Sequence, residues 1–406
     1  MSTELQDSGD RLASGPGRAP QMSQVEEQRL RAGRLLSDFQ DVPKYQKPVG
    51  NYVSLYAGAG GLDIGFALAG FVPLWVSELD PTALATHDKA FVRMANERPH
   101  LRDRSYTSRP GDLLAIPDSE RPGEGSADLI IGGPPCQGFS VAGKMDPSDE
   151  RSKHVFHYMD MVERIKPKAF VLENVKALYA NRRWSDIRKM LLERAVELGY
   201  NATLTLVNAS HFGVPQARER MLLLGVRTDL GAPILPEPTT PNDFPTVREA
   251  LSLLPKYGEP GNNSFCNARI TTAKAPVLRR SPFAGMLFNG AGRPLNLSAP
   301  STTLAASMGG NKTPIIDQRE FEFESAESWV VGYHSQLLES GGEAVVSEVP
   351  GYLRRLTVEE AAAIQTFPIG MEFCGTRSSQ YRQIGNAVSP RLALAVAESI
   401  KKALGL

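Results

Sequence analysis

Short apolar runs alternate with helical patterns through the first half of this chain. The apolar runs lie at 52–56, 72–76, 128–131, 169–172 and 221–226. Helical patterns separate them, for example at 62–69 and 184–198, and Pro81 is placed to open another helix. Strands that alternate with helices in this way predict a doubly wound α/β fold with a mostly parallel sheet.

The pattern changes beyond residue 231. A proline-rich stretch at 232–245 cannot form a continuous helix or a central strand, and we interpret it as a linker. Gly, Asn, Ser and Thr are then frequent until about residue 351, after which a capping box of Thr357 and Glu360 begins a helix. Pro390 begins another helix, which runs to about residue 404. We expect a loosely ordered extension at 1–48, a main domain at 49–232 and 353–406, and a smaller irregular domain at 233–352.

Composition adds mainly exclusions. The chain has 406 residues, of which 41% are hydrophobic and 22% charged, as in globular proteins that bury a sizeable core. Lys plus Arg number 45, as do Asp plus Glu, which argues against binding nucleic acid through a strongly basic tail. The three cysteines, Cys136, Cys266 and Cys374, are too scattered for a disulfide framework or a zinc site. We expect no metal, a reducing cytoplasmic compartment, and neither a signal peptide nor a membrane span.

Glycines crowd the turn after the first predicted strand. Gly58, Gly60 and Gly61 let the backbone turn tightly and approach a ligand beside a helix N-terminus. Their spacing is not that of a G-x-G-x-x-G pyrophosphate loop. Glu78 closes the next strand, where a carboxylate can accept hydrogen bonds from ribose hydroxyls. A structural turn that binds nothing explains the glycines equally well.

A cysteine lies in a loop bounded by glycine and proline. Two prolines hold the backbone extended after the strand 128–131, so Cys136 projects from the carboxyl edge of the sheet, where open α/β proteins build their sites. The alternative is a small buried hydrophobe, but this placement favours a nucleophile. The loop 143–154 that follows is suited to close over a substrate.

Three polar motifs complete the candidate site. Glu173 ends a predicted strand, where it can act as a proton donor or, alternatively, only balance a helix dipole. Arg218 and Arg220 have strand spacing, so both can point to one face and bind phosphate or carbonyl oxygens, unless they are merely solvated. Gly385 and Asn386 predict a turn before the last helix, which meets a ligand or only caps that helix.

In this order, the motifs resemble those of the C5-cytosine DNA methyltransferase family. The resemblance covers about residues 50–230 and 353–406. Its motifs are YAGAGG at 56–61, PPCQGFS at 134–140, ENV at 173–175, QARER at 216–220 and GNAVSP at 385–390. The chain departs mildly from the family at Tyr56, where Phe is usual, and at Ala387, where Ser is frequent.

The resemblance implies S-adenosyl-L-methionine as the cofactor. Tyr56 would pack on its adenine, Glu78 would bind the ribose, and Asp112 would take the adenine amino group. The implied cofactor-binding residues are Tyr56, Gly58, Gly60, Gly61, Glu78, Leu79, Asp112, Leu113, Pro134, Asn386 and Val388.

The resemblance also implies the chemistry of methyl transfer to cytosine C5. The Cys136 thiolate would attack C6 of the base, and Glu173 would hold the exocyclic amine and protonate N3. Arg220 would lie beside the cytosine carbonyl and Arg218 near a phosphate. The cytosine must flip out of the duplex to reach the thiolate. Three implied DNA contacts lie in the loop that closes on it, Gln137, Ser140 and Lys144.

The smaller domain would then be a target-recognition domain. Between residues 262 and 318 six basic residues stand against a single acid, Asp317. A basic, glycine-rich segment can follow phosphates and enter the major groove, and Thr302, Thr303 and Lys312 are its implied contacts. A scaffolding loop with merely solvated charges is the alternative. Positive charge is thus local, although the net charge is zero.

We therefore expect a sequence-specific DNA cytosine-C5 methyltransferase that acts as a monomer on double-stranded DNA in a prokaryotic cytoplasm. It would protect host DNA from a partner restriction enzyme. One alternative is a tRNA cytosine methyltransferase, although the Cys-Phe-Thr signature of that branch is absent. Another is a catalytically silent DNA-binding regulator, against which Cys136, Glu173 and Arg220 argue.

Overall fold

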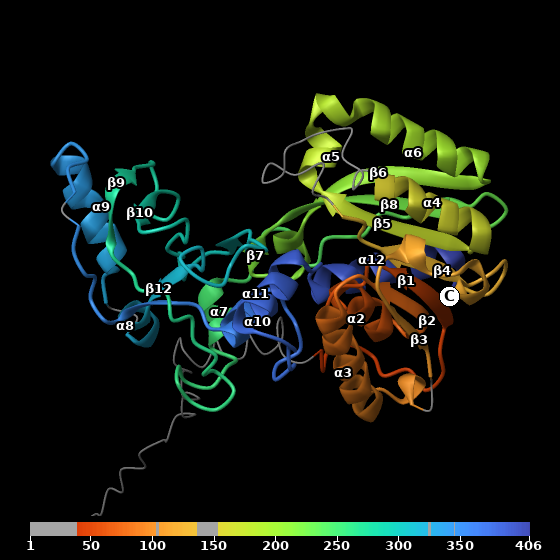
Figure 1. Ribbon diagram of the computed structural model, residues 1–406, viewed down its shortest axis with the longest axis horizontal. Coiled ribbons are helices and arrows are strands. Elements are labelled where there is room, and N and C mark those ends of the chain that lie inside the picture. The colour runs from red at the N-terminus through yellow and green to blue at the C-terminus, as the bar shows by residue number, and fades with distance from the viewer. Residues whose placement is uncertain (1–38, 103–104, 136–152, 324–325, 345) are drawn as a thin grey trace, which may run out of the picture.

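The chain folds into two lobes of unequal size (Figure 1). The computed structural model describes residues 39–102, 105–135, 153–323, 326–344 and 346–406. Three helices lie between the lobes, α7 (Val247–Leu251), α10 (Val358–Ile364) and α11 (Arg377–Asn386).

A seven-stranded sheet forms the larger lobe, in the strand order β3-β2-β1-β4-β5-β8-β6. Its strands are β1 (Gly50–Leu55), β2 (Phe71–Glu78), β3 (Thr107–Pro110), β4 (Leu129–Gly132), β5 (Ala169–Val175), β6 (Tyr200–Asn208) and β8 (Glu219–Arg227). Neighbouring strands are parallel from β3 to β5, whereas β8 is antiparallel to both of its neighbours. The predicted doubly wound, mostly parallel α/β fold is confirmed.

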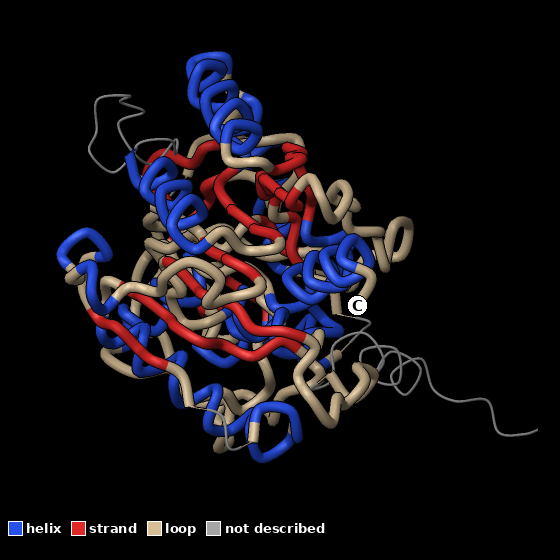
Figure 2. The backbone as a smooth tube through the Cα atoms, turned by 90° about the vertical axis from the view of Figure 1, so that its right-hand side faces the viewer, coloured by secondary structure: helices blue, strands red, loops and turns tan. Residues whose placement is uncertain are grey.

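Helices cover both faces of this sheet (Figures 1 and 2). On one face lie α2 (Gly61–Leu68) and α12 (Pro390–Leu404), and on the other α4 (His154–Ile165) and α6 (Ser185–Glu197). Successive residues of β5 show the alternation, because Val171 packs with the first helix pair and Leu172 with the second. Strands buried on both faces need apolar residues at every position, which explains the continuous apolar runs.

Strand β6 and the direction of β8 are two features that the apolar runs do not predict. Most side chains of β6 are only half-buried at the edge of the sheet, so its sequence has no continuous apolar run. Residues 209–218 join β6 to β8, and this connection is too short for the crossover that a parallel pair requires. Strand β8 therefore turns back between β5 and β6.

The smaller lobe is built from two-stranded sheets and short helices. Strand β9 (Thr272–Val277) pairs with β10 (Met286–Phe288), and β12 (Ile315–Asp317) pairs with β13 (Leu353–Arg355). Helix α9 (Trp329–Glu339) lies at its outer end, and α8 (Gln318–Glu322) lies beside β12 (Figure 1). Its core is a small cluster that contains Leu287, Phe288 and Leu337. The domain boundaries at 232 and 353 stay a prediction.

Residues 39–48 pack against the larger lobe, unlike the loosely ordered extension expected for residues 1–48. Phe39 and Val42 are buried, and the Arg98 guanidinium donates hydrogen bonds to both of their carbonyl oxygens. Arg391 of α12 forms an ion pair with Asp41 at 2.8 Å. Residues 1–38 lie outside the described residues. In the part that is described, no helix is both long and apolar enough to cross a bilayer.

Candidate active site

The predicted site residues of the larger lobe gather at the carboxyl edge of its sheet. Strand β2 ends there at Glu78, and Glu173 lies near the same end of β5. Because β8 runs the other way, its first residues reach this edge too, and Arg220 pairs with Val175 in the register. The antiparallel direction of one strand thus brings the arginine motif to the glutamate.

Glu78 braces the glycine turn with both carboxylate oxygens. Its Oε2 accepts a hydrogen bond from the Gly58 amide at 2.8 Å, and its Oε1 accepts one from the Asp80 amide at 2.9 Å. Burial raises the pKa of this carboxyl, although the two amides oppose the shift. Each carboxylate oxygen keeps a second lone pair, so Glu78 can still accept a hydroxyl from a ligand.

The three glycines of the turn are required for different reasons. A Cβ on Gly61 would lie 2.1 Å from the Val388 carbonyl oxygen, and one on Gly60 would lie 2.8 Å from the His87 ring. Gly58 has a φ of +59° and open space around its Cβ position. Packing therefore explains Gly60 and Gly61, whereas Gly58 offers an unobstructed backbone to a ligand.

Three of the other predicted cofactor residues are exposed. Leu79 is 66% exposed, and Asp112 and Asn386 also face solvent. The Asp112 carboxylate accepts a hydrogen bond from the Leu114 amide at 3.0 Å. The predicted contact Leu113 has its side chain in the apolar core, so only its backbone is available to a ligand.

Tyr56 stands at the start of the turn in a left-handed conformation, with a φ of +58°. Its hydroxyl lies 3.1 Å from Nδ1 of His154 on α4, with the two rings edge to face. A non-glycine residue at positive φ is strained, and such strain is often found at ligand sites. The ring is half-buried, which leaves one part accessible to a flat ligand.

A buried ion pair that no sequence motif indicates lies under the glycine turn. His87 of α3 (Pro81–Glu97) has its Nε2 3.3 Å from Oδ1 of Asp63 in α2, and both side chains are fully buried. On its other side, Nδ1 of His87 lies 3.3 Å from Asp88 and 3.2 Å from the Tyr106 hydroxyl. Burial by itself would lower the pKa of His87, but its carboxylate neighbours raise the pKa to about 9.

Glu173 and Arg220 form an ion pair at the end of β5. Nε of Arg220 lies 2.7 Å from Oε1 of Glu173, which is only 8% exposed. Burial raises the pKa of the Glu173 carboxyl, and the guanidinium groups of Arg220 and Arg218 oppose this shift. Burial thus favours the protonated carboxyl, which can donate a proton, whereas the guanidinium groups favour the carboxylate.

The backbone before the predicted nucleophile is fixed against this glutamate. A Cβ on Gly133 would lie 3.0 Å from Oε2 of Glu173, so the chain passes close to the carboxylate. Pro134 accepts a hydrogen bond through its carbonyl oxygen from the Asn174 side chain at 3.1 Å. Asn174 therefore positions the backbone at Pro134, and it belongs to the same ENV motif as Glu173. Cys136, Gln137, Ser140 and Lys144 lie outside the described residues.

Arg218 differs from its prediction. The side chain does not face a phosphate-binding surface, because the residue is only 2% exposed. Its guanidinium donates to the Leu304 carbonyl at 3.1 Å and to the Gly385 carbonyl at 2.7 Å. Arg218 therefore joins three segments that are distant in sequence.

A buried polar network continues this junction. The side-chain amide of Gln216 donates a hydrogen bond to Oε1 of Gln365 at 3.0 Å, and its oxygen accepts one from the Leu304 amide at 3.0 Å. Gln365 in turn donates to the Ile384 carbonyl at 2.8 Å and accepts from the Ser389 hydroxyl at 2.6 Å. Periodicity gives no signal for Gln365, because it is a buried polar residue just after α10.

The predicted turn at Gly385 and Asn386 is wrong, because both residues form the end of α11. The glycine is needed for close approach instead. A Cβ there would lie 2.5 Å from the Ala305 carbonyl oxygen. Asn386 remains exposed, and Val388 is buried with its carbonyl against Gly61.

The predicted DNA contacts of the smaller domain lie on its surface. Thr302, Thr303 and Lys312 are all exposed. Strand β11 (Ser301–Thr302) pairs in parallel with β7 (Gln216–Ala217), and the Thr303 hydroxyl donates to the Ala217 carbonyl at 3.0 Å. This segment is therefore attached directly to the arginine motif.

Among the described residues, no group of His, Cys, Asp or Glu could hold a metal.

Comparisons with known proteins agree with this geometry. A family model described as C-5 cytosine-specific DNA methylase matches residues 50–402. The chain is 32% identical to the Type II methyltransferase M1.HphI of Haemophilus parahaemolyticus over 86% of each chain. It is also 32% identical to the Type II methyltransferase M.XorII of Xanthomonas oryzae, over 88% of this chain and 85% of that one. Its fold resembles the methyltransferase EhMeth of Entamoeba histolytica, with a TM-score of 0.58 at 17% identity over 88% of this chain and 99% of that one.

Proposed function

The chain belongs to the C-5 cytosine-specific DNA methylase family, and from this premise we propose how its residues carry out the reaction. Its activity is the transfer of a methyl group from S-adenosyl-L-methionine to C5 of cytosine in DNA. We further propose that it is the modification enzyme of a restriction-modification system, since its relatives M1.HphI and M.XorII are named Type II methyltransferases.

The cofactor is assigned to the open space beside Gly58. When bound, S-adenosyl-L-methionine would supply an electrophilic methyl group and keep the electron pair of the broken sulfur–methyl bond as a neutral thioether. The remaining lone pairs of Glu78 suit the ribose hydroxyls, and Tyr56, Leu79 and Asp112 surround the place for the adenine. The glycine backbone at 58–61 and the polar end of α11 at Asn386 would border the methionine part. Leu113 and Pro134 would contribute backbone atoms.

Cys136 is assigned as the nucleophile. Its thiolate sulfur bonds to C6 of a flipped cytosine while Glu173 gives a proton to N3, which leaves an enamine. C5 then takes the methyl group. A water molecule removes the proton from C5, the thiolate leaves C6, and N3 returns its proton to Glu173. Glu173 therefore ends the cycle protonated and Cys136 ends it as a thiolate.

The observation that carries this proposal is the 2.7 Å ion pair of Glu173 with Arg220 beside the backbone of Gly133 and Pro134. A nearby guanidinium lowers the cost of a thiolate and can donate to the cytosine carbonyl. Arg218 is assigned a positioning role in place of a phosphate contact. Gln137, Ser140, Lys144, Thr302, Thr303 and Lys312 are assigned to DNA binding.

Radiolabelled methyl transfer tests the substrate. We expect label in duplex DNA and none in tRNA, and label in tRNA alone would overturn the DNA assignment. A duplex that contains 5-fluorocytosine should form a covalent adduct with the wild-type protein and none with Cys136→Ser. A silent DNA-binding regulator would bind the duplex without any adduct. The Cys136→Ser variant should still bind S-adenosyl-L-methionine, which separates loss of chemistry from loss of folding.

We also propose that the enzyme acts as a monomer in the cytoplasm of a prokaryotic cell. The support is that its relatives include enzymes of bacteria such as Haemophilus and Xanthomonas. The asymmetric arrangement of one catalytic lobe and one recognition lobe also matches a single flipped base. Light scattering of the protein with and without duplex DNA should give the mass of one chain and of one chain per duplex.

A further inference from the structure

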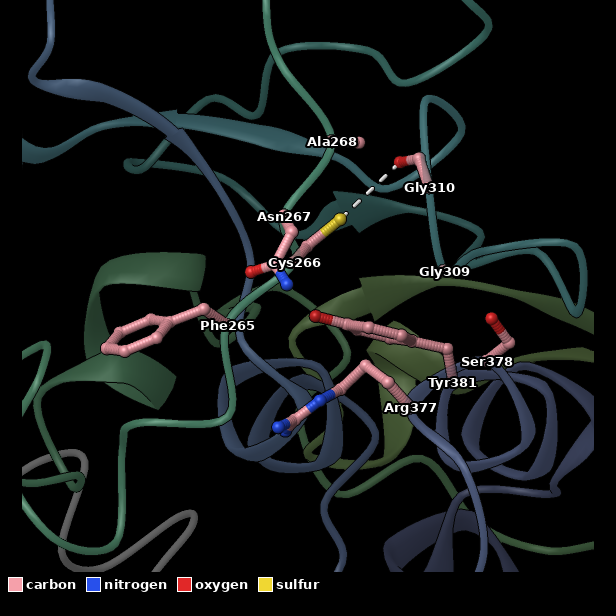
Figure 3. A pocket seen from close by; sticks show the side chains of 9 residues that line it. All are labelled: Phe265, Cys266, Asn267, Ala268, Gly309, Gly310, Arg377, Ser378 and Tyr381. Atoms are coloured by element: carbon pink, nitrogen blue, oxygen red, sulfur yellow. Dashed lines mark hydrogen bonds between the residues drawn. The ribbon is translucent and has the colours of Figure 1, made fainter.

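A glycine-rich loop of the smaller lobe presents polar groups to solvent, and we call residues 309–313 the recognition loop. Asn311 and Lys312 are exposed at its tip. A Cβ on Gly309 would lie 3.1 Å from Cα of Ser378 in α11, whereas a Cβ on Gly310 would meet no atom within 4 Å. Gly310 faces a cavity of 440 Å³ that also contacts Cys266 and Tyr381 (Figure 3). On the cavity side, Sγ of Cys266 lies 3.6 Å from the Gly310 carbonyl oxygen and 3.4 Å from the Thr313 hydroxyl. Further contacts hold the loop from its other side.

Arg355 supplies those contacts from the end of β13. Its Nη1 donates to the Thr313 carbonyl at 2.7 Å and to the Asn311 carbonyl at 3.3 Å. Its Nε donates to the Ala268 carbonyl at 3.1 Å, and its Nη2 lies 3.4 Å from the Asn289 side-chain oxygen. One guanidinium thus ties the recognition loop to the segments at 268 and 289.

Arg355 is, like Arg98, a buried arginine whose guanidinium donates to backbone carbonyls. Arg355 is 3% exposed, and among the described residues no carboxylate pairs with it. Burial lowers the pKa of its guanidinium. A buried cation costs free energy that backbone carbonyls offset only if they all point correctly. The planar fork of arginine can satisfy several carbonyls at fixed angles, which a lysine cannot do.

Two further features fix the same loop. The Thr313 hydroxyl accepts hydrogen bonds from the amides of Gly309 at 3.0 Å and Gly310 at 3.1 Å. Opposite the loop, a Cβ on Gly292 would lie 2.2 Å from the Thr313 carbonyl and 2.6 Å from Nη1 of Arg355. The backbone of the recognition loop is therefore held both by the Thr313 hydroxyl within the loop and by Arg355 and Gly292 next to it. The side chains at its tip remain exposed.

We propose that Arg355 is a positioning residue for DNA sequence recognition. Its guanidinium fixes the recognition loop so that Asn311 and Lys312 meet the bases and phosphates of the target in one register. This inference rests on the proposed function, which assigns the loop to DNA binding. A more mobile recognition loop should reduce the preference for the target DNA sequence more than it reduces the rate of methyl transfer. The reason is that Glu173 and Arg220 lie on other strands.

The neighbouring Arg354 offers a matched control. It is also buried, but its guanidinium binds both oxygens of Glu360 at 2.6 and 2.7 Å and lies 3.8 Å over the Tyr257 ring. Among the described residues, Arg354 forms no hydrogen bond or ion pair with the recognition loop. Arg354→Lys and Arg355→Lys both keep the charge and lose the fork, so both should lower Tm. Only Arg355→Lys should change sequence selection.

The experiment uses the purified full chain, S-adenosyl-L-methionine and an unmethylated plasmid. Short reactions are followed by base-resolution sequencing of 5-methylcytosine. This gives the initial rate at the preferred sequence and at every sequence that differs from it by one base. We expect Arg355→Lys to raise the ratio of one-base-variant to preferred rates about tenfold, the size of one lost base contact. Thr313→Val, which loosens the loop without altering Arg355, should shift the ratio in the same direction.

Binding of S-adenosyl-L-methionine, measured by calorimetry, should be the same in all four proteins. An unchanged ratio in both Arg355→Lys and Thr313→Val would overturn the inference, as would an equal rise in Arg354→Lys. Wild-type protein that leaves no 5-methylcytosine in the plasmid would instead refute the proposed function. The two failures are therefore distinguishable.

Discussion

The larger and the smaller lobe hold their exposed polar residues in place by different means. In the larger lobe, strand ends and a tight turn do so, and Glu78 accepts hydrogen bonds from two amides of its own surroundings. In the smaller lobe, short strands leave the loops without such support, and the buried Arg355 binds their carbonyls directly. At a regular sheet edge the strand order positions the site residues. In the irregular lobe, a buried side chain such as Arg355 positions the loops by hydrogen bonds to their carbonyls.

The largest effect should come from the catalytic edge of the larger lobe. Glu173→Gln removes the proton that the enamine step requires, so kcat should fall by about 10³-fold. Tm should fall too, because the Arg220 guanidinium loses its carboxylate partner. Steady-state methyl transfer to duplex DNA measures this. Glu219→Gln is the control. Glu219 is next to Arg220 at the start of β8, but it forms an exposed ion pair with Lys176. A Glu173→Gln enzyme with more than a tenth of wild-type kcat would contradict the role of Glu173.

Packing of the glycine turn should give the next largest effect. Gly61→Ala places a Cβ 2.1 Å from the Val388 carbonyl, so unfolding free energy should drop by about 3 kcal/mol. Gly58→Ala meets no atom and only adopts an unfavourable φ, so its cost should be about 1 kcal/mol. Urea denaturation of both variants compares them. Equal costs would show that backbone strain, and not the close approach of Val388, controls this turn.

The buried pair under the turn predicts a pH dependence. The pKa of His87 is about 9 in the folded protein, above its ordinary value of 6.5, because Asp63 and Asp88 face it. The stability it contributes is therefore complete below pH 6.5 and is lost as pH rises through about 9. Tyr106 and the Tyr52 hydroxyl, which bonds the Asp63 carbonyl, are the other titratable groups that face this cluster.

Denaturation of wild type and His87→Gln across pH 6 to 10 measures this contribution. Wild type should lose up to about 3 kcal/mol more than the variant over this range. The smaller lobe has no comparable buried histidine–carboxylate pair among the described residues, so the loss should appear in the larger lobe. Parallel curves for the two proteins would contradict the ion pair.

The smallest effect should come from a surface ion pair of the smaller lobe. Arg269 is 80% exposed and pairs with Glu348. Arg269→Ala should change the unfolding free energy by no more than about 0.5 kcal/mol, because exposed ion pairs are screened by solvent. Arg354→Lys in the same lobe should cost several times more. Urea denaturation measures both variants. Equal losses of unfolding free energy would contradict the view that buried arginines stabilise the smaller lobe more than exposed ion pairs do.

The sequence predicts the larger lobe well because its central strands are buried on both faces. The runs at 169–172 and 221–226 lie inside β5 and β8, and the capping box of Thr357 and Glu360 begins α10. Glu173, Arg220 and Glu78 lie at the predicted sheet edge, since residues that end strands come together there by topology. The assignment of each residue to cofactor, catalysis or DNA stays a prediction.

The sequence could not predict features that depend on contacts between distant segments. Arg218 has the spacing of a surface arginine pair, yet the packing of Leu304 and Gly385 around it buries its guanidinium. Asp63, His87 and Gln365 are buried polar residues, for which the hydrophobic periodicity gives no signal. Arg355 follows a second arginine at the end of a three-residue strand, and only the fold separates their roles.

The contact between Gly61 and Val388 has a consequence for the order of synthesis. The turn at Gly61 emerges early from the ribosome, but the carbonyl that packs on it belongs to a segment made long afterwards. Helix α12, which covers the same face as α2, follows still later. A nascent chain therefore exposes the apolar face of α2 through most of translation. The glycine turn reaches its final packing only after nearly all of the chain has been made.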